Sequence, residues 1–334
     1  MSIAIITGSG GLVGAESVKF FSKKFVKIIG IDNDLRKYFF GKSASVKANI
    51  NLLKKEIKNY NHKYIDIRNN QKIESIFKSY KKNIKFILHC AAQPSHDWAA
   101  KEPFTDFTTN TLGTLNILEN MRKYCPNAKL AYLSTNKVYG DRPNFLPLRE
   151  NKKRYEILKK HKFFPKGINE TMNIDHSKHS LFGASKLSAD IYCQEYWKYF
   201  NLDVGIFRAG CLTGRLHRGA ELHGFLSYLI KAAKKGKKYF IFGYKGKQVR
   251  DNIHSEDVIQ ALWEFYKTKN NRGVYNIGGG RSNSCSILEM ADILKNQHNI
   301  KLNYKILKKN RSGDHIWYIS DNSKFKNKHK NWKI

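Results

Sequence analysis

Cysteine, proline and acidic residues are scarce in this chain of 334 residues, which has 5 Cys, 6 Pro and 27 Asp and Glu. The cysteines are scattered and include no Cys-x-x-Cys pair, so the sequence indicates neither a disulfide framework nor a zinc site, and we predict no metal centre. No apolar run approaches the roughly 18 residues that a membrane-spanning helix needs. The first residues lack the basic leader and cleavage site of a signal peptide. We therefore expect a cytoplasmic protein with no membrane span.

Because the chain has 61 Lys and Arg and only 27 Asp and Glu, its formal net charge is +34. Such a charge can indicate a polyanionic partner, such as RNA, DNA or an anionic membrane. Here the excess is mostly Lys spread along the chain, as in KNYNHKY and KAAKKGKK, and Arg-rich or aromatic-interleaved nucleic-acid motifs are absent. We interpret the charge mainly as lysine on solvated faces and expect no specific nucleic-acid partner. A positive field would still help to recruit an anionic substrate.

Hydrophobic residues make up 41% of the chain, which is enough for one large domain or two interleaved ones. The first half alternates short β-branched runs with amphipathic stretches, a pattern that indicates βαβ units and a parallel sheet. Strands are predicted over residues 3–7, 26–32, 63–66, 86–90, 130–134 and 204–208. Helices are predicted over residues 12–21, 71–78, 103–123 and 181–200.

Beyond residue 208 this alternation breaks up. Further helices are expected within 219–236, 255–267 and 286–297, and a late strand and turn within 274–280. The Lys- and Asn-rich tail after Asp321 is expected to be frayed surface. The order predicts an α/β fold, a doubly wound parallel-sheet Rossmann fold with a smaller C-terminal lobe. The Rossmann domain would comprise residues 1–208 and 250–278, and the lobe 209–249 and 279–334.

A glycine-rich loop predicts a dinucleotide site. The segment IAIITGSGGLVG leads from a strand through Gly8, Gly11 and Gly14 into a helix. Glycines let the backbone turn sharply and approach a pyrophosphate, and the helix N-terminus presents free N–H groups. The next strand ends in Asp32, about 20 residues on, where a carboxylate can hydrogen-bond the ribose hydroxyls. That carboxylate would repel a 2′-phosphate, so NAD is favoured over NADP, although Arg36 weakens the preference.

Two later segments are expected to join this site. Asp66 and Ile67 follow a predicted strand, where a carboxylate and an amide could meet an adenine edge, although Asp66 alone could equally be a turn residue. Ala91 and Ala92 follow another strand and are small enough to allow close approach of the cofactor.

The order of these motifs, followed by TTNTLGTLN, STNKVYG and the lysine of SLFGASK, resembles the extended short-chain dehydrogenase/reductase superfamily. More narrowly, the chain is similar to the nucleotide-sugar epimerases, in particular the CDP-paratose 2-epimerase (CDP-tyvelose epimerase) family. The narrower resemblance rests on AAQPSHDWAAKEPFTDFTTNTLGTLN, STNKVYGD, FRAGCLTG, ELHGFLSYL, GYKGKQVRDNIHSEDV and RSGDHIWYISD. It implies NAD-dependent epimerisation of a nucleotide-diphosphate sugar through a keto-sugar, with CDP-paratose converted to CDP-tyvelose at C2. Another sugar-nucleotide 4-epimerase or a reductase is the alternative. Lipopolysaccharide or another surface glycan would be the destination of the sugar.

The resemblance also implies which residues form the site. Thr135 would hydrogen-bond the reacting sugar oxygen, and Lys186 would bind the nicotinamide ribose. Arg250 and Arg311 would hold the diphosphate, for which guanidinium groups are suited. The implied cofactor-binding residues are Gly8, Gly11, Leu12, Gly14, Asp32, Asn33, Asp66, Ile67, Ala91, Ala92, Asn110 and Lys186. The implied substrate-binding residues are Gln93, Ser95, Thr135, Asn136, Glu221, Leu222, His223, Arg250 and Arg311.

One catalytic position departs from the family pattern. In SLFGASK, Phe182 stands where the family has the tyrosine that accepts the hydroxyl proton, one helical turn before Lys186. We favour the hypothesis that another group accepts the proton. The candidates are Lys186 itself, Thr135 through a water, Tyr139, and His179, whose side chain titrates in a useful range. The other hypothesis is a catalytically weak NAD-binding module.

Two further departures narrow the substrate and the reaction. Cys211 occupies a position where UDP-sugar epimerases carry Asn, which argues mildly against a UDP-galactose-type substrate. Asn136 and Lys137 follow Thr135, where dehydratases place Asp and Glu, so the acid/base pair that removes water is missing. The family also implies a homodimer or homotetramer, with the helices at 103–123 and 181–200 forming a four-helix bundle.

Overall fold

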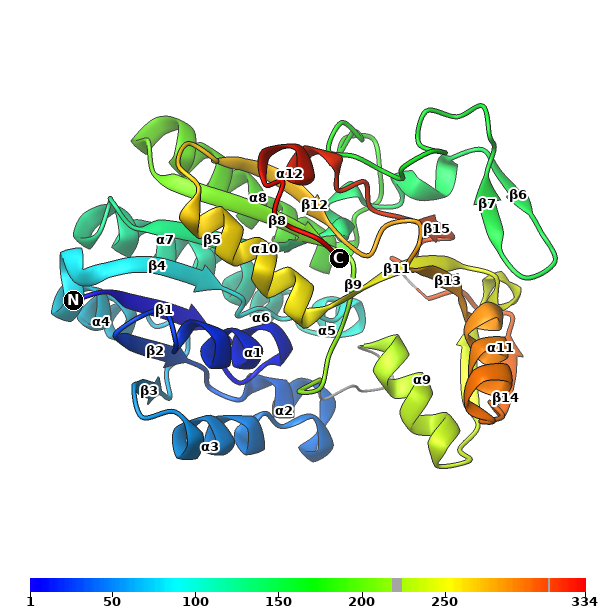
Figure 1. The fold of residues 1–334 in the computed structure, drawn as a ribbon, viewed down its shortest axis with the longest axis horizontal. Coiled ribbons are helices and arrows are strands. Elements are labelled where there is room, and N and C mark those ends of the chain that lie inside the picture. Colours follow the sequence, from blue (N-terminus) through cyan, green and yellow to red (C-terminus); the bar gives the residue numbers. More distant parts are fainter. Residues whose placement is uncertain (218–223, 312) are drawn as a thin grey trace.

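The computed structural model describes residues 1–217, 224–311 and 313–334. Within these residues the centre is a seven-stranded parallel sheet in the order β12-β8-β5-β4-β1-β2-β3 (Figure 1). Its strands are β1 (Ile3–Thr7), β2 (Lys27–Ile31), β3 (Tyr60–Lys63), β4 (Ile84–His89), β5 (Lys129–Thr135), β8 (Asp203–Ala209) and β12 (Gly273–Ile277). The strand order reverses on either side of β1 and β4, which is the topology of a doubly wound fold. The predicted fold class is therefore confirmed.

Helices cover both faces of this sheet. Helices α1 (Leu12–Phe21) and α10 (Ser255–Lys267) pack on one face, and α4 (Asn70–Tyr80), α7 (Gly113–Tyr124) and α8 (Ser180–Phe200) pack on the other (Figure 1). The strands are apolar on both sides because each face is buried, as is usual in parallel sheets. The remaining helices near the sheet are α2 (Leu35–Phe40), α3 (Lys47–Glu56), α5 (His96–Lys101) and α6 (Pro103–Phe107).

The predicted helix over 103–123 is interrupted. Between α6 and α7, residues Thr108–Leu112 form a π-helical turn. Such turns insert one residue into the helical repeat and are frequent at functional sites. Here the turn contains Asn110, whose side chain is buried.

The third strand lies earlier than predicted. It spans Tyr60–Lys63, where it pairs with residues 28–31 of β2, and not 63–66. Asp66 ends the extended run because its carboxylate accepts the backbone N–H of Arg68, two residues on, at 2.9 Å. This local bond is an Asx turn, which competes with the sheet ladder.

The tail after Asp321 is not frayed, so that prediction was wrong. Helix α12 (Ser323–Lys328) packs through Phe325, which is fully buried and stacks on the ring of His329 with centroids 4.1 Å apart. Trp332 is also buried, and its Nε1 donates to the carbonyl of Asp257 at 2.8 Å. The Lys- and Asn-rich composition conceals these aromatic anchors, which recur at helical spacing.

A smaller group of strands and helices lies beyond the carboxyl ends of the central strands (Figure 1). One small sheet contains β9 (Cys211–Thr213), β11 (Val249–His254), β13 (Ser284–Ser286) and β15 (Trp317–Tyr318). Strands β10 (Tyr239–Phe242) and β14 (Tyr304–Leu307) pair beside α9 (Phe225–Lys234) and α11 (Ile287–His298). Strands β6 (Leu148–Glu150) and β7 (Tyr155–Ile157) form a hairpin.

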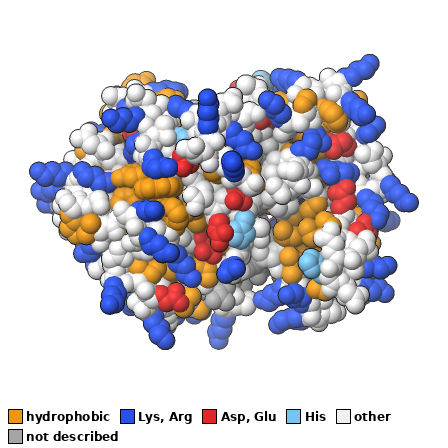
Figure 2. Space-filling model, in the orientation of Figure 1, with side chains coloured by type: hydrophobic (Ala, Val, Ile, Leu, Met, Phe, Trp, Pro, Cys, Tyr) orange, Lys and Arg blue, Asp and Glu red, His pale blue; other side chains and the backbone are white. Residues whose placement is uncertain are grey.

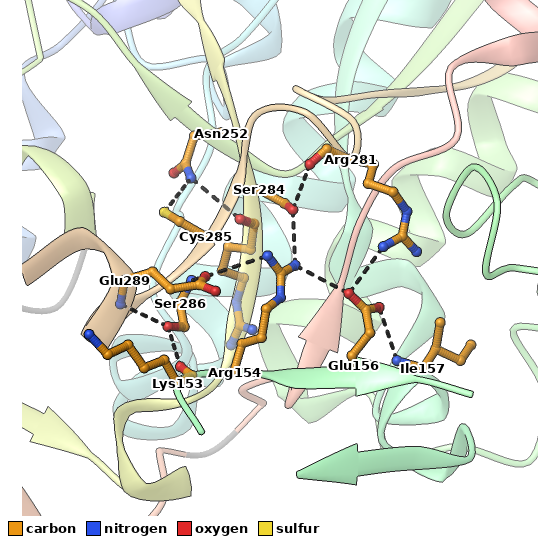
Figure 3. A network of polar contacts seen from close by, with 11 residues as sticks. Lys153, Arg154, Glu156, Ile157, Asn252, Arg281, Ser284, Cys285, Ser286 and Glu289 are labelled. Atoms are coloured by element: carbon orange, nitrogen blue, oxygen red, sulfur yellow. Dashed lines mark hydrogen bonds and ion pairs between the residues drawn. The ribbon is translucent and has the colours of Figure 1, made fainter. Parts of the chain in front are cut away.

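A polar network attaches the β6–β7 hairpin to this group (Figure 3). The Arg154 guanidinium lies 3.6 Å from the Glu156 carboxylate and 3.5 Å from that of Glu289 on α11. Glu156 also pairs with Arg281 at 3.0 Å. Ser286 and Glu289 form a capping box at the start of α11, so the network fixes the hairpin to a helix end whose own donors are satisfied.

Lys and Arg side chains are scattered over the visible face of the molecule, among polar and hydrophobic areas, and do not gather in one stripe (Figure 2). In the described ranges, none of the helices combines the length and apolar character needed to cross a bilayer.

A buried ion pair holds α8 against the sheet. The Arg208 guanidinium of β8 donates to both carboxylate oxygens of Asp190 on α8, at 3.0 and 2.9 Å. Ser134 of β5 donates to the same carboxylate at 2.6 Å. Burial alone would lower the pKa of Arg208, and the attraction of Asp190 together with Tyr139 raises it above its ordinary value. The pair therefore ties two strands and one helix together at a single point.

We expect Asp190→Ala to lower the free energy of unfolding by about 3–5 kcal/mol, because it leaves a buried guanidinium without its carboxylate. Urea denaturation followed by circular dichroism measures the change. The control is Asp175→Ala, which removes an exposed carboxylate and should alter stability by less than about 0.5 kcal/mol. A loss below about 1 kcal/mol for Asp190→Ala would contradict the role given to the pair.

Candidate active site

A cavity of about 470 Å³ opens at the carboxyl ends of the parallel strands. One wall comes from residues that follow β1, β2 and β4 or end β5, and the opposite wall comes from the smaller group of elements, including Phe240, Arg250 and Arg311. Ligands of open α/β sheets bind at this edge. The predicted residues that line the cavity are Gly8, Gly11, Leu12, Gly14, Asp32, Asn33, Asp66, Ile67, Ala91, Ala92, Thr135, Asn136, Phe182, Lys186, Arg250 and Arg311.

The glycine loop fits a pyrophosphate. Gly8 has a φ of 67°, and a Cβ on Gly14 would lie 2.1 Å from the carbonyl oxygen of Gly8. Only glycine therefore lets α1 pack this closely on the loop. Gly11 at the N-cap contributes no side-chain oxygen to the first turn of α1, so the backbone N–H groups there suit an anion.

The carboxylate of Asp32 is held at the end of β2. It accepts the backbone N–H of Gly10 at 2.9 Å and that of Asp34 at 2.8 Å. Burial raises the pKa of Asp32, and these two bonds act in the opposite direction. Arg36 also lines the cavity, and burial lowers its pKa to about 10. The arrangement suits ribose hydroxyls, which can donate to a fixed carboxylate.

Asp66 lines the same region but is already engaged. Arg68 donates to its carboxylate at 2.6 Å, and Asn33 does so at 3.0 Å. Burial would raise the pKa of Asp66, and the bonds from Arg68 more than offset that effect and lower it. Asp66 and Asn33, both predicted to bind the cofactor, are thus joined by a direct hydrogen bond.

Thr135, the last residue of β5, lines the cavity, and so does Lys186. The Thr135 Oγ1 accepts the backbone N–H of Lys137 at 3.3 Å. The Lys186 Nζ donates to the carbonyl of Leu133 at 3.0 Å and lies 4.3 Å from the ring centroid of Tyr132. Burial lowers the pKa of Lys186 to about 8, so this ammonium keeps its charge at neutral pH.

A cluster of charged groups lines the far wall. Arg250 pairs with Asp314, and Arg311 lies 3.5 Å from Asp97. The Lys137 Nζ donates to the carbonyl of Gly313 at 2.9 Å. Burial lowers the pKa of Lys137 to about 8. Arg250, Arg311, Lys137 and Asp314 together leave a net positive wall, which favours an anionic ligand group.

Three residues predicted at the site lie behind the wall and not on it. Gln93, Ser95 and Asn110 are buried and are not among the described residues lining the cavity. Asn110 accepts the backbone N–H of Gln93 at 2.9 Å and donates to Ser185 of α8 at 3.0 Å. Gln93 in turn donates to the Ser95 carbonyl at 2.9 Å. These side chains position the loop after β4 against α8, so a direct ligand contact is not supported.

His179 does not line the cavity either. Its Nε2 lies 3.0 Å from the carbonyl oxygen of Val138, and its ring borders a shallow depression on the outside of α8. Proximity to Phe182 in sequence therefore does not make it a base for this site. Tyr139 is fully buried, and its hydroxyl donates to Asn276 at 2.8 Å. Glu221, Leu222 and His223 lie outside the described residues.

The structure adds His96, Lys137 and Asp314 to the cavity wall. None of the three was predicted as a site residue. His96 follows Ser95 in PSHDW, so the segment was recognised, but its side-chain direction depends on α5 and could not be inferred from the motif. Asp314 likewise follows Arg311 in RSGDH, where only the arginine had a chemical reason to be chosen.

A model of the NAD dependent epimerase/dehydratase family matches residues 4–278. The chain is 31% identical over 331 residues to CDP-paratose 2-epimerase of Salmonella typhi. The aligned region covers 97% of this chain and 92% of that protein. It is 29% identical to a putative UDP-glucose 4-epimerase of Methanocaldococcus jannaschii, over 88% of this chain and 81% of the relative.

Among solved structures, UDP-glucuronic acid 4-epimerase of Bacillus cereus in complex with UDP-glucuronic acid and NAD has a similar fold. The TM-score is 0.78 at 22% identity, over 100% of this chain and 94% of that one. The family match and the glycine loop agree on the cofactor. The chain therefore belongs to the NAD dependent epimerase/dehydratase family of enzymes, with NAD as its cofactor.

Proposed function

We propose that the protein inverts one carbon of a nucleotide-diphosphate sugar by transient oxidation to a keto-sugar, and that the substrate is CDP-paratose, inverted at C2 to CDP-tyvelose. One observation carries this proposal: a single cavity brings the glycine loop, Thr135 and the arginines 250 and 311 together. The identity with CDP-paratose 2-epimerase over nearly the whole of both chains supports the choice of sugar.

NAD, when bound, supplies the hydride acceptor and then the hydride donor. We assign the pyrophosphate to the loop of Gly8, Gly11 and Gly14, and the ribose hydroxyls to Asp32. We assign the nicotinamide ribose to Lys186, because this buried lysine lines the same cavity as Thr135. The reaction has no net redox change, so the cofactor is expected to remain bound through the cycle.

On the substrate side, we assign the diphosphate to Arg250 and Arg311, whose planar groups can bond phosphate oxygens in pairs. We assign to Thr135 the hydrogen bond to the sugar oxygen that becomes a carbonyl. Asn136 follows Thr135 and is buried, and neither Asn136 nor Lys137 offers the carboxylate pair that dehydration requires. The site therefore favours epimerisation over loss of water.

Turnover tests this function directly. We expect CDP-paratose, incubated with the NAD-loaded protein, to give a mixture of the two C2 epimers by NMR. Arg250→Gln should lower kcat/KM roughly 10–100-fold, because a charge-assisted bond to phosphate is worth about 1.5–3 kcal/mol. Arg149→Gln, which removes an exposed arginine, is the matched control. Absence of turnover with CDP-paratose and with related CDP-, UDP- and GDP-sugars would refute the proposal.

Cofactor preference tests the role of Asp32. We expect NAD to bind at least about tenfold more tightly than NADP. Asp32→Asn should lower this ratio of affinities, because the substitution removes the charge that repels a 2′-phosphate while it keeps an oxygen that can accept the Gly10 N–H. Titration calorimetry measures both constants. Asp34→Asn is the control, since the Asp34 carboxylate accepts from Ser45 and Val46. If the ratio of NAD to NADP affinity is unchanged in Asp32→Asn, residues other than Asp32 set the cofactor preference.

We also propose that two copies pair through α6, α7 and α8. Apolar side chains are exposed on α6 and α8, including Phe104 at 86%, Phe107 at 52%, Ile191 at 40% and Tyr199 at 80%. Water contact with such a surface is unfavourable, and the burial of adjacent apolar helices in a four-helix bundle removes it.

The double variant Phe107→Glu/Ile191→Glu is expected to be monomeric, because pairing would bury four carboxylates. Light scattering should give about twice 38.7 kDa, or a higher multiple, for the parent chain and about 38.7 kDa for the variant. Phe145→Glu changes a phenylalanine that is 70% exposed outside these helices and should leave the mass unaltered. A monomeric parent chain would exclude the pairing.

A further inference from the structure

The tyrosine hydroxyl that Phe182 lacks leaves the proposed reaction without an obvious proton acceptor. Phe182 is buried at the start of α8 and lines the cavity. Its ring keeps the position that the family motif gives to the tyrosine, one turn before Lys186. A replacement base must therefore lie beside this ring and face the same cavity.

The His96 ring meets both requirements. It packs edge-on against the Phe182 ring, with centroids 4.9 Å apart and planes at 75°, and it lines the cavity. It comes from the first residue of α5, which packs against α8. We propose that His96 is the proton acceptor of this enzyme, taking the place of the missing tyrosine hydroxyl; this rests on the proposed function.

A hydrogen bond to Ser180 on α8 orients the His96 ring. The His96 Nδ1 lies 2.8 Å from the Ser180 Oγ. Ser180 begins α8 with a φ of 60°, a conformation that residues other than glycine rarely adopt. Its Oγ also accepts the backbone N–H of Gly183 at 3.3 Å. A hydroxyl oxygen has two lone pairs, so it can accept from both Gly183 and the Nδ1–H.

The other ring nitrogen of His96, Nε2, can act as the proton acceptor. When Nδ1 carries the hydrogen and donates to Ser180, the lone pair of Nε2 is available to accept a proton. Across the described part of the chain, no hydrogen-bond partner of Nε2 is present. The loop after β4, which leads into α5 and His96, is attached to α8 by Asn110, which bonds Gln93 and Ser185. The base and the helix of Phe182 are thus fixed to each other.

The charges around His96 keep it in its basic form. Burial, then Lys137 and Arg311, lowers the pKa of His96 to about 3, while Asp314 acts in the opposite direction. His315 also interacts electrostatically with His96. A diphosphate bound by Arg311 would neutralise part of this positive field and raise the pKa of His96 towards the useful range. Binding of the substrate would therefore strengthen the base that acts on it.

The proton and electron balance is complete. In the forward half-reaction the carbinol O–H bond breaks and its proton goes to His96 Nε2, while the C–H electron pair leaves as hydride to the nicotinamide. After the keto-sugar has presented its other face, the hydride returns to carbon and the His96 Nε2–H gives its proton to the carbonyl oxygen. Imidazole and cofactor both end in their starting states.

Kinetics of paired variants test the assignment. We expect His96→Gln to lower kcat by about 10²–10⁴-fold with little change in the affinity for NAD. Adding Phe182→Tyr to that variant should restore a large part of the loss, because it places a hydroxyl at the same edge of the cavity. Phe182→Tyr alone should change kcat less than about tenfold. His298→Gln, at the exposed end of α11, is the matched control.

The pH profile separates His96 from the lysines. A base at Lys186 or Lys137, whose pKa values lie near 8, would make kcat rise tenfold per pH unit up to about 8. A base at His96 predicts a flat profile through that range, with the fall at lower pH, and loss of that lower limb in the rescued double variant. Full kcat in His96→Gln, or a profile limited near pH 8, would overturn the proposal.

Titration of the ring decides the matter even if the parent chain turns over none of the sugars. NMR of the imidazole in the NAD-bound protein, with and without CDP, reports the His96 pKa. A rise of at least about one unit on adding CDP supports His96 as the base that faces the diphosphate site. An unchanged value would show that the ring does not respond to that site and would reject it. Failure of turnover with all of these sugars would instead reject the proposed function.

Discussion

The buried pair of Arg208 and Asp190 is the interaction on which the site depends. It joins β8 to α8, and Ser134 attaches β5 to the same carboxylate. Arg208 also reaches the Tyr139 hydroxyl at 3.2 Å, in the turn that follows Thr135. Because α8 carries Phe182 and Lys186 and β5 ends in Thr135, one charged pair fixes the two elements that bring these three residues to the cavity wall. A site built on two rigid elements can hold that geometry without a bound ligand.

The parts of the account that the sequence predicted are local in the chain. The helix at 12–21 begins where the glycine loop ends. The spacing of the glycines follows from the close approach of Gly14 to the Gly8 carbonyl, which leaves no room for a side chain. Asp32 follows its strand directly, so its place at the cofactor edge needed no long-range information. The family and NAD could be inferred for the same reason, and both are confirmed. The roles of the individual residues stay predictions.

The parts that the sequence did not predict depend on contacts between distant segments. His96 meets Phe182 across 86 positions, and nothing in PSHDW shows which way its ring points. His179 was proposed for its nearness to Phe182 in sequence and for the titration range of a histidine. Gln93 and Ser95 belong to the right loop, but the Gln93 side chain donates to the Ser95 carbonyl and to Asp106, and the Ser95 hydroxyl accepts the backbone N–H of Trp98. The tail after Asp321 was wrongly predicted to be frayed, because its many lysines outnumber the two aromatic residues, Phe325 and Trp332, that are buried.

The central claim is that one cavity removes a hydride from a sugar carbon and returns it to the same carbon. The most direct measurement uses CDP-paratose carrying deuterium at C2, with the product analysed by NMR in ordinary water. A hydride shuttle predicts that the CDP-tyvelose formed keeps the deuterium at C2 with inverted configuration. Loss of the label to solvent would show that C2 is deprotonated instead, and would contradict the account.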